Sequence, residues 1–129
     1  MKTGELCSYL DAVVPLSLQE SYDNSGLQVG LPEKEIEAAL ITLDVTEEVL
    51  EEAVSKGCGL IISHHPVIFK GLRKLAWSSP VERIIARAIR NDIAIYSAHT
   101  NLDMLGTGVS RKLAEKLGLS DIRVLQPLK

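Results

Sequence analysis

The sequence has few cysteines, no basic excess and no long apolar run, and each absence excludes a class of protein. Its two cysteines, Cys7 and Cys58, are too few and too far apart for a disulfide framework or a Cys-x-x-Cys metal knuckle. The formal net charge is −3. This charge argues against non-specific nucleic-acid binding, because such binding needs a basic face. No apolar run approaches the roughly 18 residues that a membrane span requires.

The N-terminal segment and the composition favour one compact cytoplasmic domain. Residues 1–10 are polar and interrupted, so they lack the apolar core of a signal peptide. Hydrophobic residues make up 46% of the chain, and no charge run or low-complexity tract indicates disorder. A chain of 129 residues is long enough for its own core. We therefore expect residues 1–129 to form a single α/β domain with reduced thiols.

Helical patterns and short aliphatic runs alternate along the chain. We predict helices over about 4–14, 47–56, 80–90 and 108–117, and strands over 38–43, 59–63, 93–97 and, as one more strand, 122–125. Near-continuous aliphatic strands separated by helices are typical of a parallel sheet that helices cover on both faces. The predicted fold class is α/β, with a parallel or mixed sheet flanked by helices.

Three hydroxyl residues mark predicted helix starts. Thr3 and Thr46 each precede an amphipathic segment, where a side-chain oxygen can accept a hydrogen bond from the first turn. Ser79, Pro80 and Glu82 have the spacing of a capping box, with proline at the first helical position. These signals indicate where the connections between strands and helices begin.

The most reactive side chains follow the ends of the predicted strands. Asp44 follows the first strand, His64 and His65 follow the second, and His99 follows the third with Asp103 four residues on. In parallel α/β sheets, ligands bind beyond the carboxyl ends of the strands. All three histidines of the protein therefore lie where a ligand site is expected.

Two adjacent histidines at a strand end favour metal ligation over a structural role. Pro66 restricts His65 to an extended backbone, so both rings can point to neighbouring positions. Neutral imidazole is a good ligand for zinc, iron, nickel or manganese. Asp103 would neutralise part of the charge, and we predict His64, His65 and Asp103 as metal ligands. His99 either binds the metal or donates a hydrogen bond that orients a ligand or substrate, and the second role is favoured.

Three further polar features have open interpretations. Asp44 leads into a predicted helix, and local structure explains it better than a role in the site. Asp23 and Asn24 form either an Asx turn or a loop over the metal crevice. The cations of residues 70–74 are candidates for binding a phosphate, although a solvated loop or a subunit contact is the commoner role.

Three segments resemble the motifs of one family. Residues 22–30 read YDNSGLQVG and resemble the W-D-N-x-G-L-Q-x-G segment of the GTP cyclohydrolase I type 2 homolog family, also called NIF-three-like. Residues 61–69, IISHHPVIF, resemble its H-H-P-x-F signature, and residues 96–103, YSAHTNLD, its H-T-N-x-D segment. The motifs occur in the family's order, and only Tyr22 departs, standing where tryptophan is commoner. The resemblance covers essentially the whole chain.

The resemblance implies an α/β fold, a ring-shaped homohexamer and two divalent metal ions in each subunit. On the matching positions, His64, His65 and Asp103 correspond to the family's N-terminal metal ligands, and His99 to a polar residue beside them. The family's other ligands lie in a C-terminal His-x-x-x-Glu segment, which this sequence lacks. Family members are longer, so we expect a shortened chain, corresponding to their N-terminal part, with an open and weakened site.

The same resemblance implies metal-dependent hydrolysis of a nucleotide such as GTP, with release of formate from the purine's imidazole ring. His99 would then shuttle a proton or orient the substrate. Two alternatives stay open: a non-catalytic metal-binding scaffold or regulatory protein, and a metal-dependent phosphoesterase, because paired metals also serve phosphate chemistry. Whether this chain is an enzyme by itself is left open by its length.

Overall fold

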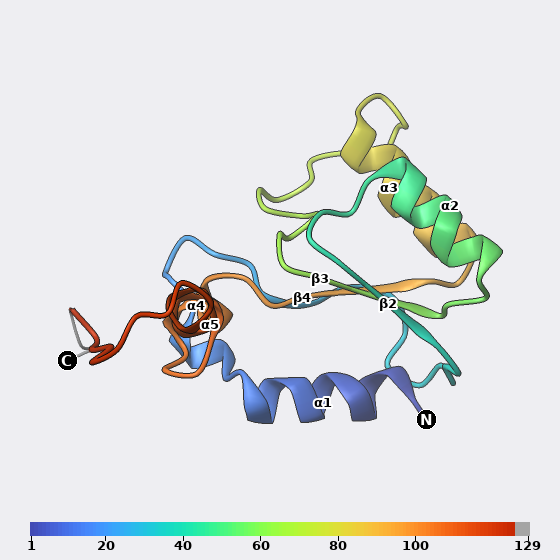
Figure 1. Ribbon diagram of the computed structural model, residues 1–129. Helices are drawn as coiled ribbons and strands as arrows, with labels where there is room; N and C mark the ends of the chain where they lie inside the picture. The colour runs from blue at the N-terminus through green and yellow to red at the C-terminus, as the bar shows by residue number, and fades with distance from the viewer. Residues whose placement is uncertain (126–129) are drawn as a thin grey trace.

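The computed structural model describes residues 1–125 and contains a four-stranded sheet flanked by helices (Figure 1). The predicted α/β fold class is confirmed. In chain order the elements are α1 (Thr3–Val13), the 3₁₀ helix η1 (Leu16–Leu18), β1 (Gly26–Val29), β2 (Ala39–Thr42), α2 (Glu47–Ser55), β3 (Leu60–Ser63), α3 (Pro80–Arg90), β4 (Ala94–Ser97), α4 (Thr100–Met104) and α5 (Val109–Lys116).

The sheet is mixed, with strand order β1-β4-β3-β2. β2, β3 and β4 are parallel, as the alternation of strands and helices predicts, but β1 pairs with β4 in the antiparallel direction. Of the two predicted alternatives, a parallel or a mixed sheet, the mixed sheet is therefore confirmed. Gly26, at the start of β1, pairs with Ser97, at the end of β4. The segment before β1 consequently lies at the same sheet edge as the carboxyl ends of the parallel strands.

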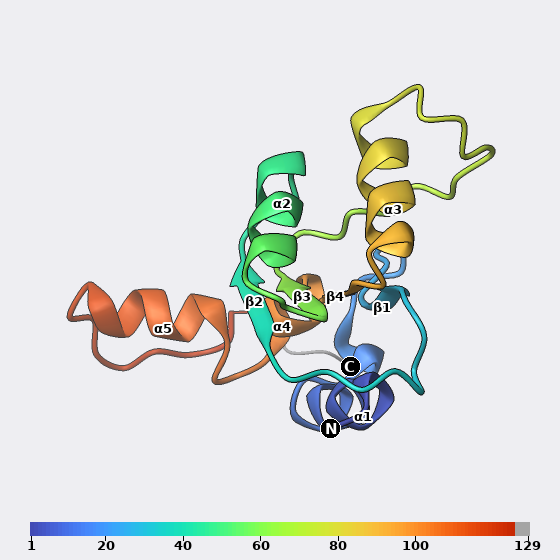
Figure 2. The same cartoon turned by 90° about the vertical axis from the view of Figure 1, so that its right-hand side faces the viewer.

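Helices cover both faces of the sheet. α2 and α3 lie on one face and α1 on the other (Figures 1 and 2). The larger core cluster fills the space under α2 and α3 and includes Leu50, Ile61, Ile85 and Ile95. Burial of such aliphatic side chains is the main driving force for folding. The two central strands are thus covered on both sides, which explains their continuous aliphatic sequences.

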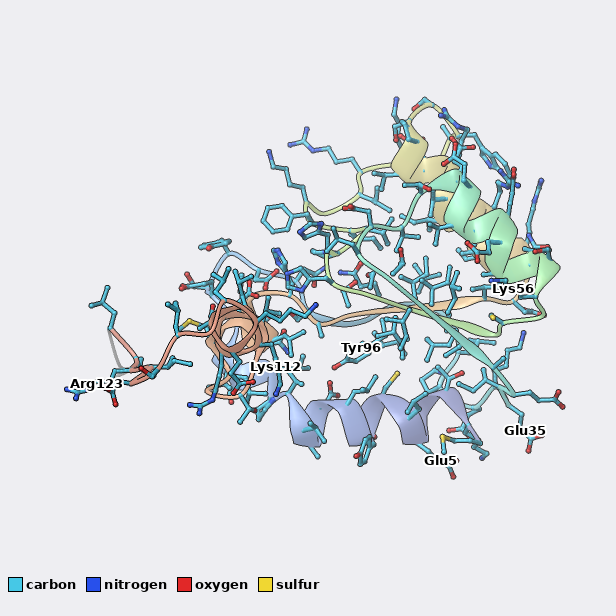
Figure 3. The ribbon with its side chains drawn as sticks, in the orientation of Figure 1. Glu5, Glu35, Lys56, Tyr96, Lys112 and Arg123 are labelled. Atoms are coloured by element: carbon cyan, nitrogen blue, oxygen red, sulfur yellow. The ribbon has the colours of Figure 1, made fainter. Side chains whose placement is uncertain are left out.

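A smaller core cluster joins α1 to the opposite face of the sheet, and it includes Cys7 and Tyr96. Figure 3 shows the Tyr96 side chain between the sheet and α1. Its hydroxyl donates a hydrogen bond of 2.7 Å to Oδ1 of Asp11. Burial, with the neighbouring Asp11 carboxylate, raises the pKa of the Tyr96 phenol well above its usual value. Tyr96 therefore stays neutral and anchors α1 to β4.

Two of the three predicted helix caps are confirmed. The Thr46 hydroxyl accepts a hydrogen bond of 3.2 Å from the Val49 amide, and the Ser79 hydroxyl accepts one of 3.2 Å from the Glu82 amide. The prediction for Thr3 is wrong, because Lys2 is the N-cap residue of α1. Thr3 is buried, and its hydroxyl donates to the Lys34 carbonyl instead. A tertiary contact has replaced the local one.

The strand predictions fail at two places. β2 is an edge strand, and its Ile41 side chain is 81% exposed, so the buried strand expected over 38–43 is only partly covered. The strand predicted over 122–125 is absent, because those residues pair with no neighbour in the sheet. An aliphatic run becomes a strand only where a partner strand accepts its hydrogen bonds.

Two helices follow β4, and the sequence predicted only the second. α4 is a short helix directly after His99. α5 lies within the predicted range 108–117 but has no buried residue, and it projects away from the layered body (Figure 2). Within residues 1–125, no helix combines the length and the apolar character needed to cross a bilayer.

Candidate metal centre

The parallel register brings the ends of β3 and β4 together. Ser63 pairs with Ser97 in the ladder, and the hydroxyl groups of these two buried residues lie 2.8 Å apart. The Ser63 hydroxyl also donates a hydrogen bond of 2.9 Å to the His65 carbonyl. This bond fixes the backbone where β3 stops. His64, His65 and His99 therefore leave the sheet at one place.

The three histidines form a cluster beyond this sheet edge. One ring nitrogen from each of His64, His65 and His99 lies within 4.8 Å of the others. The ring centroids are 5.0 Å apart for His64 and His65, 5.4 Å for His64 and His99, and 5.6 Å for His65 and His99. Zinc–imidazole bonds are about 2.0–2.1 Å long, so nitrogens as much as 4.8 Å apart would have to move closer together to bind a common ion. The cluster could bind a metal ion.

Each imidazole is oriented by a hydrogen bond at Nδ1. The acceptor is the Ala98 carbonyl for His64 at 2.8 Å, the Asp44 carboxylate for His65 at 2.7 Å and the Asp23 carboxylate for His99 at 2.8 Å. Since these groups only accept, Nδ1 carries a proton, which leaves Nε2 as the nitrogen available to bind a cation. Metal-binding histidines in proteins are oriented in this way.

Asp103 lies beside the cluster, in the first turn of α4. Its Oδ1 is 3.7 Å from Nε2 of His64, and its side chain is 41% exposed. The structure thus brings together all four residues that the sequence singled out. The His99 ring lies only slightly farther from the other two rings (5.4 and 5.6 Å) than they lie from each other (5.0 Å), so its geometry suits a ligand as well as an orienting group.

The sequence did not identify the role of Asp23. Its side chain is fully buried, and it accepts hydrogen bonds from the His99 ring, the Thr100 hydroxyl and, at 3.0 Å, the Thr100 amide. Burial alone would raise the pKa of the Asp23 carboxyl, but the hydrogen bonds from Thr100, His99 and the Asn24 amide together lower it below its usual value. The Asp23 carboxylate therefore places a fixed negative charge beside the His99 ring. This role goes beyond the Asx turn that was one of its two predicted roles.

Asp44 also takes part in the cluster. Local structure was expected to explain it, but that interpretation is wrong, because its carboxylate binds His65 across 21 positions of sequence. The Asp44 side chain is 58% exposed, so water screens this contact more than the contact between Asp23 and His99. The two carboxylates consequently hold their histidines with different strength.

Charge and exposure both suit a divalent cation. Asp23, Asp44 and Asp103 surround the three imidazoles and can balance two or more positive charges. His64 and His99 are largely covered, with side-chain exposures of 20% and 19%, whereas His65 is 47% exposed. The cluster therefore opens to solvent on the side of His65, where a further ligand or a substrate can approach.

Comparisons with known proteins agree with the fold and the motifs. The chain is 38% identical to a GTP cyclohydrolase 1 type 2 homolog from Clostridium acetobutylicum over 125 residues, which is 97% of this chain and 47% of that protein. It is similar to a Bacillus cereus protein related to NIF3 (TM-score 0.93, 43% identity, 100% of this chain and 35% of the other). A Staphylococcus aureus protein gives a TM-score of 0.91 at 43% identity, covering 98% and 41%.

The chain therefore spans less than half the length of these relatives. A family model described as Duf34/NIF3 (NGG1p interacting factor 3) matches residues 1–129. The match includes the segments that carry the histidine cluster and its carboxylates. The chain belongs to the Duf34/NIF3 family.

Proposed function

We propose that this chain contributes the N-terminal ligands of a metal-dependent hydrolytic site that acts on a nucleotide such as GTP. The observation that carries the proposal is the convergence of three imidazoles whose Nδ1 atoms are all held by acceptors. Histidine side chains held in this way are suited to binding a cation, whereas packing in a core would not require such hydrogen bonds. The printed name of the relatives, GTP cyclohydrolase 1 type 2 homolog, supports the choice of nucleotide.

His64, His65 and Asp103 would hold the metal, as zinc, iron, manganese or nickel, and a pair of ions is proposed from the family resemblance. Divalent ions bound by such residues supply Lewis acidity, a lowered pKa of bound water and charge for an anionic substrate. The carboxylates of Asp23 and Asp44 would keep the rings in place while the substrate binds. Asp103 is partly exposed beside His64, so its carboxylate would be available to bind a second ion.

His99 has a second proposed role. Its Nδ1 faces the buried Asp23 carboxylate, so Nε2 is the nitrogen that would accept a proton from water or substrate. The carboxylate stabilises the imidazolium that results, and the proton can then pass to the leaving group. As a ligand, His99 would lose this function, because Nε2 would be occupied. The metal content of a His99 variant separates the two roles.

The remaining proposals concern the whole protein. A homo-oligomer, a ring of six in the full-length form, and a cytoplasmic location are proposed from the family resemblance and the sequence. Because the chain covers 47% of the Clostridium acetobutylicum relative, further ligands and substrate contacts would come from the rest of such a protein. The isolated chain is therefore expected to bind metal more weakly than a full-length relative.

The test measures metal content and reaction products together. The chain, loaded separately with Zn²⁺, Mn²⁺, Fe²⁺ and Ni²⁺ and desalted, is analysed by elemental analysis beside His64→Ala, Asp103→Asn and His99→Ala. Asp92→Asn is the matched control, because Asp92 precedes β4 at the opposite end of the strand and is exposed. We expect His64→Ala and Asp103→Asn to lose metal with unchanged circular dichroism, and Asp92→Asn to keep it.

Product analysis with GTP then separates the reaction classes. Formate release supports the cyclohydrolase proposal, and orthophosphate release supports a phosphoesterase instead. No product from either the chain or a full-length relative, with metal retained, would favour a non-catalytic metal-binding protein. Equal metal content in the wild-type chain and in His64→Ala would contradict the metal centre itself.

A further inference from the structure

Two aromatic rings stand at the mouth of the histidine cluster and have no role in holding it. The ring centroids of Tyr22 and Phe69 are 6.5 Å apart at an interplanar angle of 66°. The Phe69 centroid is 6.0 Å from that of His99, at 89°. Both rings reach water, with Tyr22 65% and Phe69 44% exposed. Apolar area exposed directly beside a polar site is typical of a ligand-binding surface.

The chain is poor in aromatic residues, which makes this placement notable. Only five residues are Phe, Trp or Tyr (one Phe, one Trp, three Tyr), and Phe69 is the only phenylalanine. The core is almost entirely aliphatic, with Tyr96 the only aromatic in its two clusters. Phe69 therefore stabilises the folded chain less than an aromatic ring buried in the core would. A contact outside the chain is the simpler reason for its position.

The backbone that carries Phe69 is fixed before any ligand arrives. The Gln28 side-chain carbonyl accepts a hydrogen bond of 3.0 Å from the Ile68 amide, and its amide group faces the Ile68 carbonyl at 3.4 Å. The Asn24 side chain donates to the same carbonyl at 2.6 Å. Segment 24–28 is thus tied to the residue before Phe69. The ring is presented on an ordered support, which lowers the entropic cost of binding.

Tyr22 has a comparable support, because the next residue is Asp23, whose buried carboxylate binds His99 and Thr100. The loop after Phe69 adds charge. Lys70, Arg73 and Lys74 are exposed, and none forms an ion pair with any residue of the described range 1–125. An aromatic pair beside unpaired cations suits a ligand with a flat ring and a negative group.

We propose that Tyr22 and Phe69 form a stacking platform for the planar purine base of a nucleotide, placing the base beside His99. This inference rests on the proposed function, because it assigns a recognition surface to that site. Stacking on an aromatic side chain tolerates many bases, and its removal lowers affinity by about 10-fold or more. Such a platform would make binding depend on the base and not only on the phosphates.

The test compares a ligand with a base and one without. Binding of GTP and of inorganic triphosphate to the Zn²⁺-loaded chain is measured by titration calorimetry for the wild type, Phe69→Ala and Tyr22→Ala. Tyr9→Ala is the matched control, since Tyr9 lies on α1 and is 65% exposed, as Tyr22 is. We expect each platform variant to bind GTP about 10-fold more weakly. Triphosphate affinity should stay unchanged, Tyr9→Ala should match the wild type, and Phe69→Trp should restore GTP binding.

Three results would overturn the platform. One is equal GTP affinity in the wild type and Phe69→Ala, which includes the case in which neither binds. Another is an equal loss of GTP and triphosphate affinity. The third is a change of molar mass by light scattering in Phe69→Ala with GTP binding unchanged, because the rings would then belong to a protein interface. Elemental analysis of the same samples separates this inference from the metal centre, because base-dependent binding in samples that retain no zinc would count against a zinc centre and leave the platform standing.

Discussion

Oδ1 of Asp23 lies 2.8 Å from Nδ1 of His99, although the two residues are 76 positions apart in sequence. The antiparallel pairing of β1 with β4 makes this contact, because it places the start of β1 at the end of β4. The carboxylate is fully buried, whereas the imidazole edge faces the open cluster. The hydrogen bond between Asp23 and His99 thus connects a buried carboxylate to a ring of the candidate metal centre.

Asp23→Asn should weaken metal binding without unfolding the domain. This prediction takes His99 as a metal ligand: the amide keeps the size of the carboxylate but loses the charge that makes the His99 imidazole a stronger ligand. Loss of such a supporting carboxylate lowers metal affinity by about 10- to 100-fold. Competition with a chromophoric chelator measures the affinity, and Asp92→Asn controls for charge removal. Wild-type affinity in Asp23→Asn would contradict the supporting role.

Asp44→Asn should have a smaller effect than Asp23→Asn in the same competition assay. Asp44 binds His65 at 2.7 Å, but its side chain is 58% exposed and the contact is screened by water. We expect a loss of affinity of less than about 10-fold. An effect of Asp44→Asn as large as that of Asp23→Asn would show that burial does not set the strength of these contacts.

Glu82→Gln should remove part of the acid sensitivity of folding. Hydrogen bonds from the Ser78 and Ala76 amides, the first being the strongest cause, lower the pKa of Glu82 to about 2 from 4.5. A depressed folded-state pKa stabilises the fold above pH 4.5, and this contribution is lost as the pH falls toward 2. Urea midpoints at pH 7 should therefore be lower for Glu82→Gln than for wild type.

At pH 3 the gap between the midpoints of Glu82→Gln and the wild type should narrow. Glu37→Gln, an exposed carboxylate outside the helices and strands, serves as the control and should follow the wild type at both values. A constant difference across the pH range would assign the effect of Glu82→Gln to packing instead of ionisation.

Leu50→Ala should destabilise the domain strongly, because Leu50 is fully buried between α2 and the sheet. Truncation of such a side chain costs about 2–5 kcal/mol, which includes the cavity left behind. Val54→Ala is the control on the same helix, since Val54 is 45% exposed and such surface changes cost about 0.5 kcal/mol or less. Free energies of unfolding from urea titrations compare the two variants. Similar values would place α2 away from the core.

Local signals predicted the parts of the fold that depend on nearby residues. The caps at Thr46 and Ser79 and the aliphatic runs of β3 and β4 need only short-range interactions and a choice of buried face. The position of His64, His65 and His99 at one sheet edge follows from parallel strand order, so it was predictable too. Thr3 and residues 122–125 were mispredicted because their outcome depends on partners elsewhere in the chain.

The sequence by itself determined the α/β alternation, the helix starts at Thr46 and Ser79 and the identity of the clustered histidines, because periodicity and capping depend on neighbouring residues. Only the tertiary structure decided the direction of β1, and with it the burial of Asp23 against His99 and the pairing of Asp44 with His65. Strand direction is set by long-range pairing, which no local pattern encodes. The tautomers of the three imidazoles, and hence the chemistry open to them, follow from those long-range contacts.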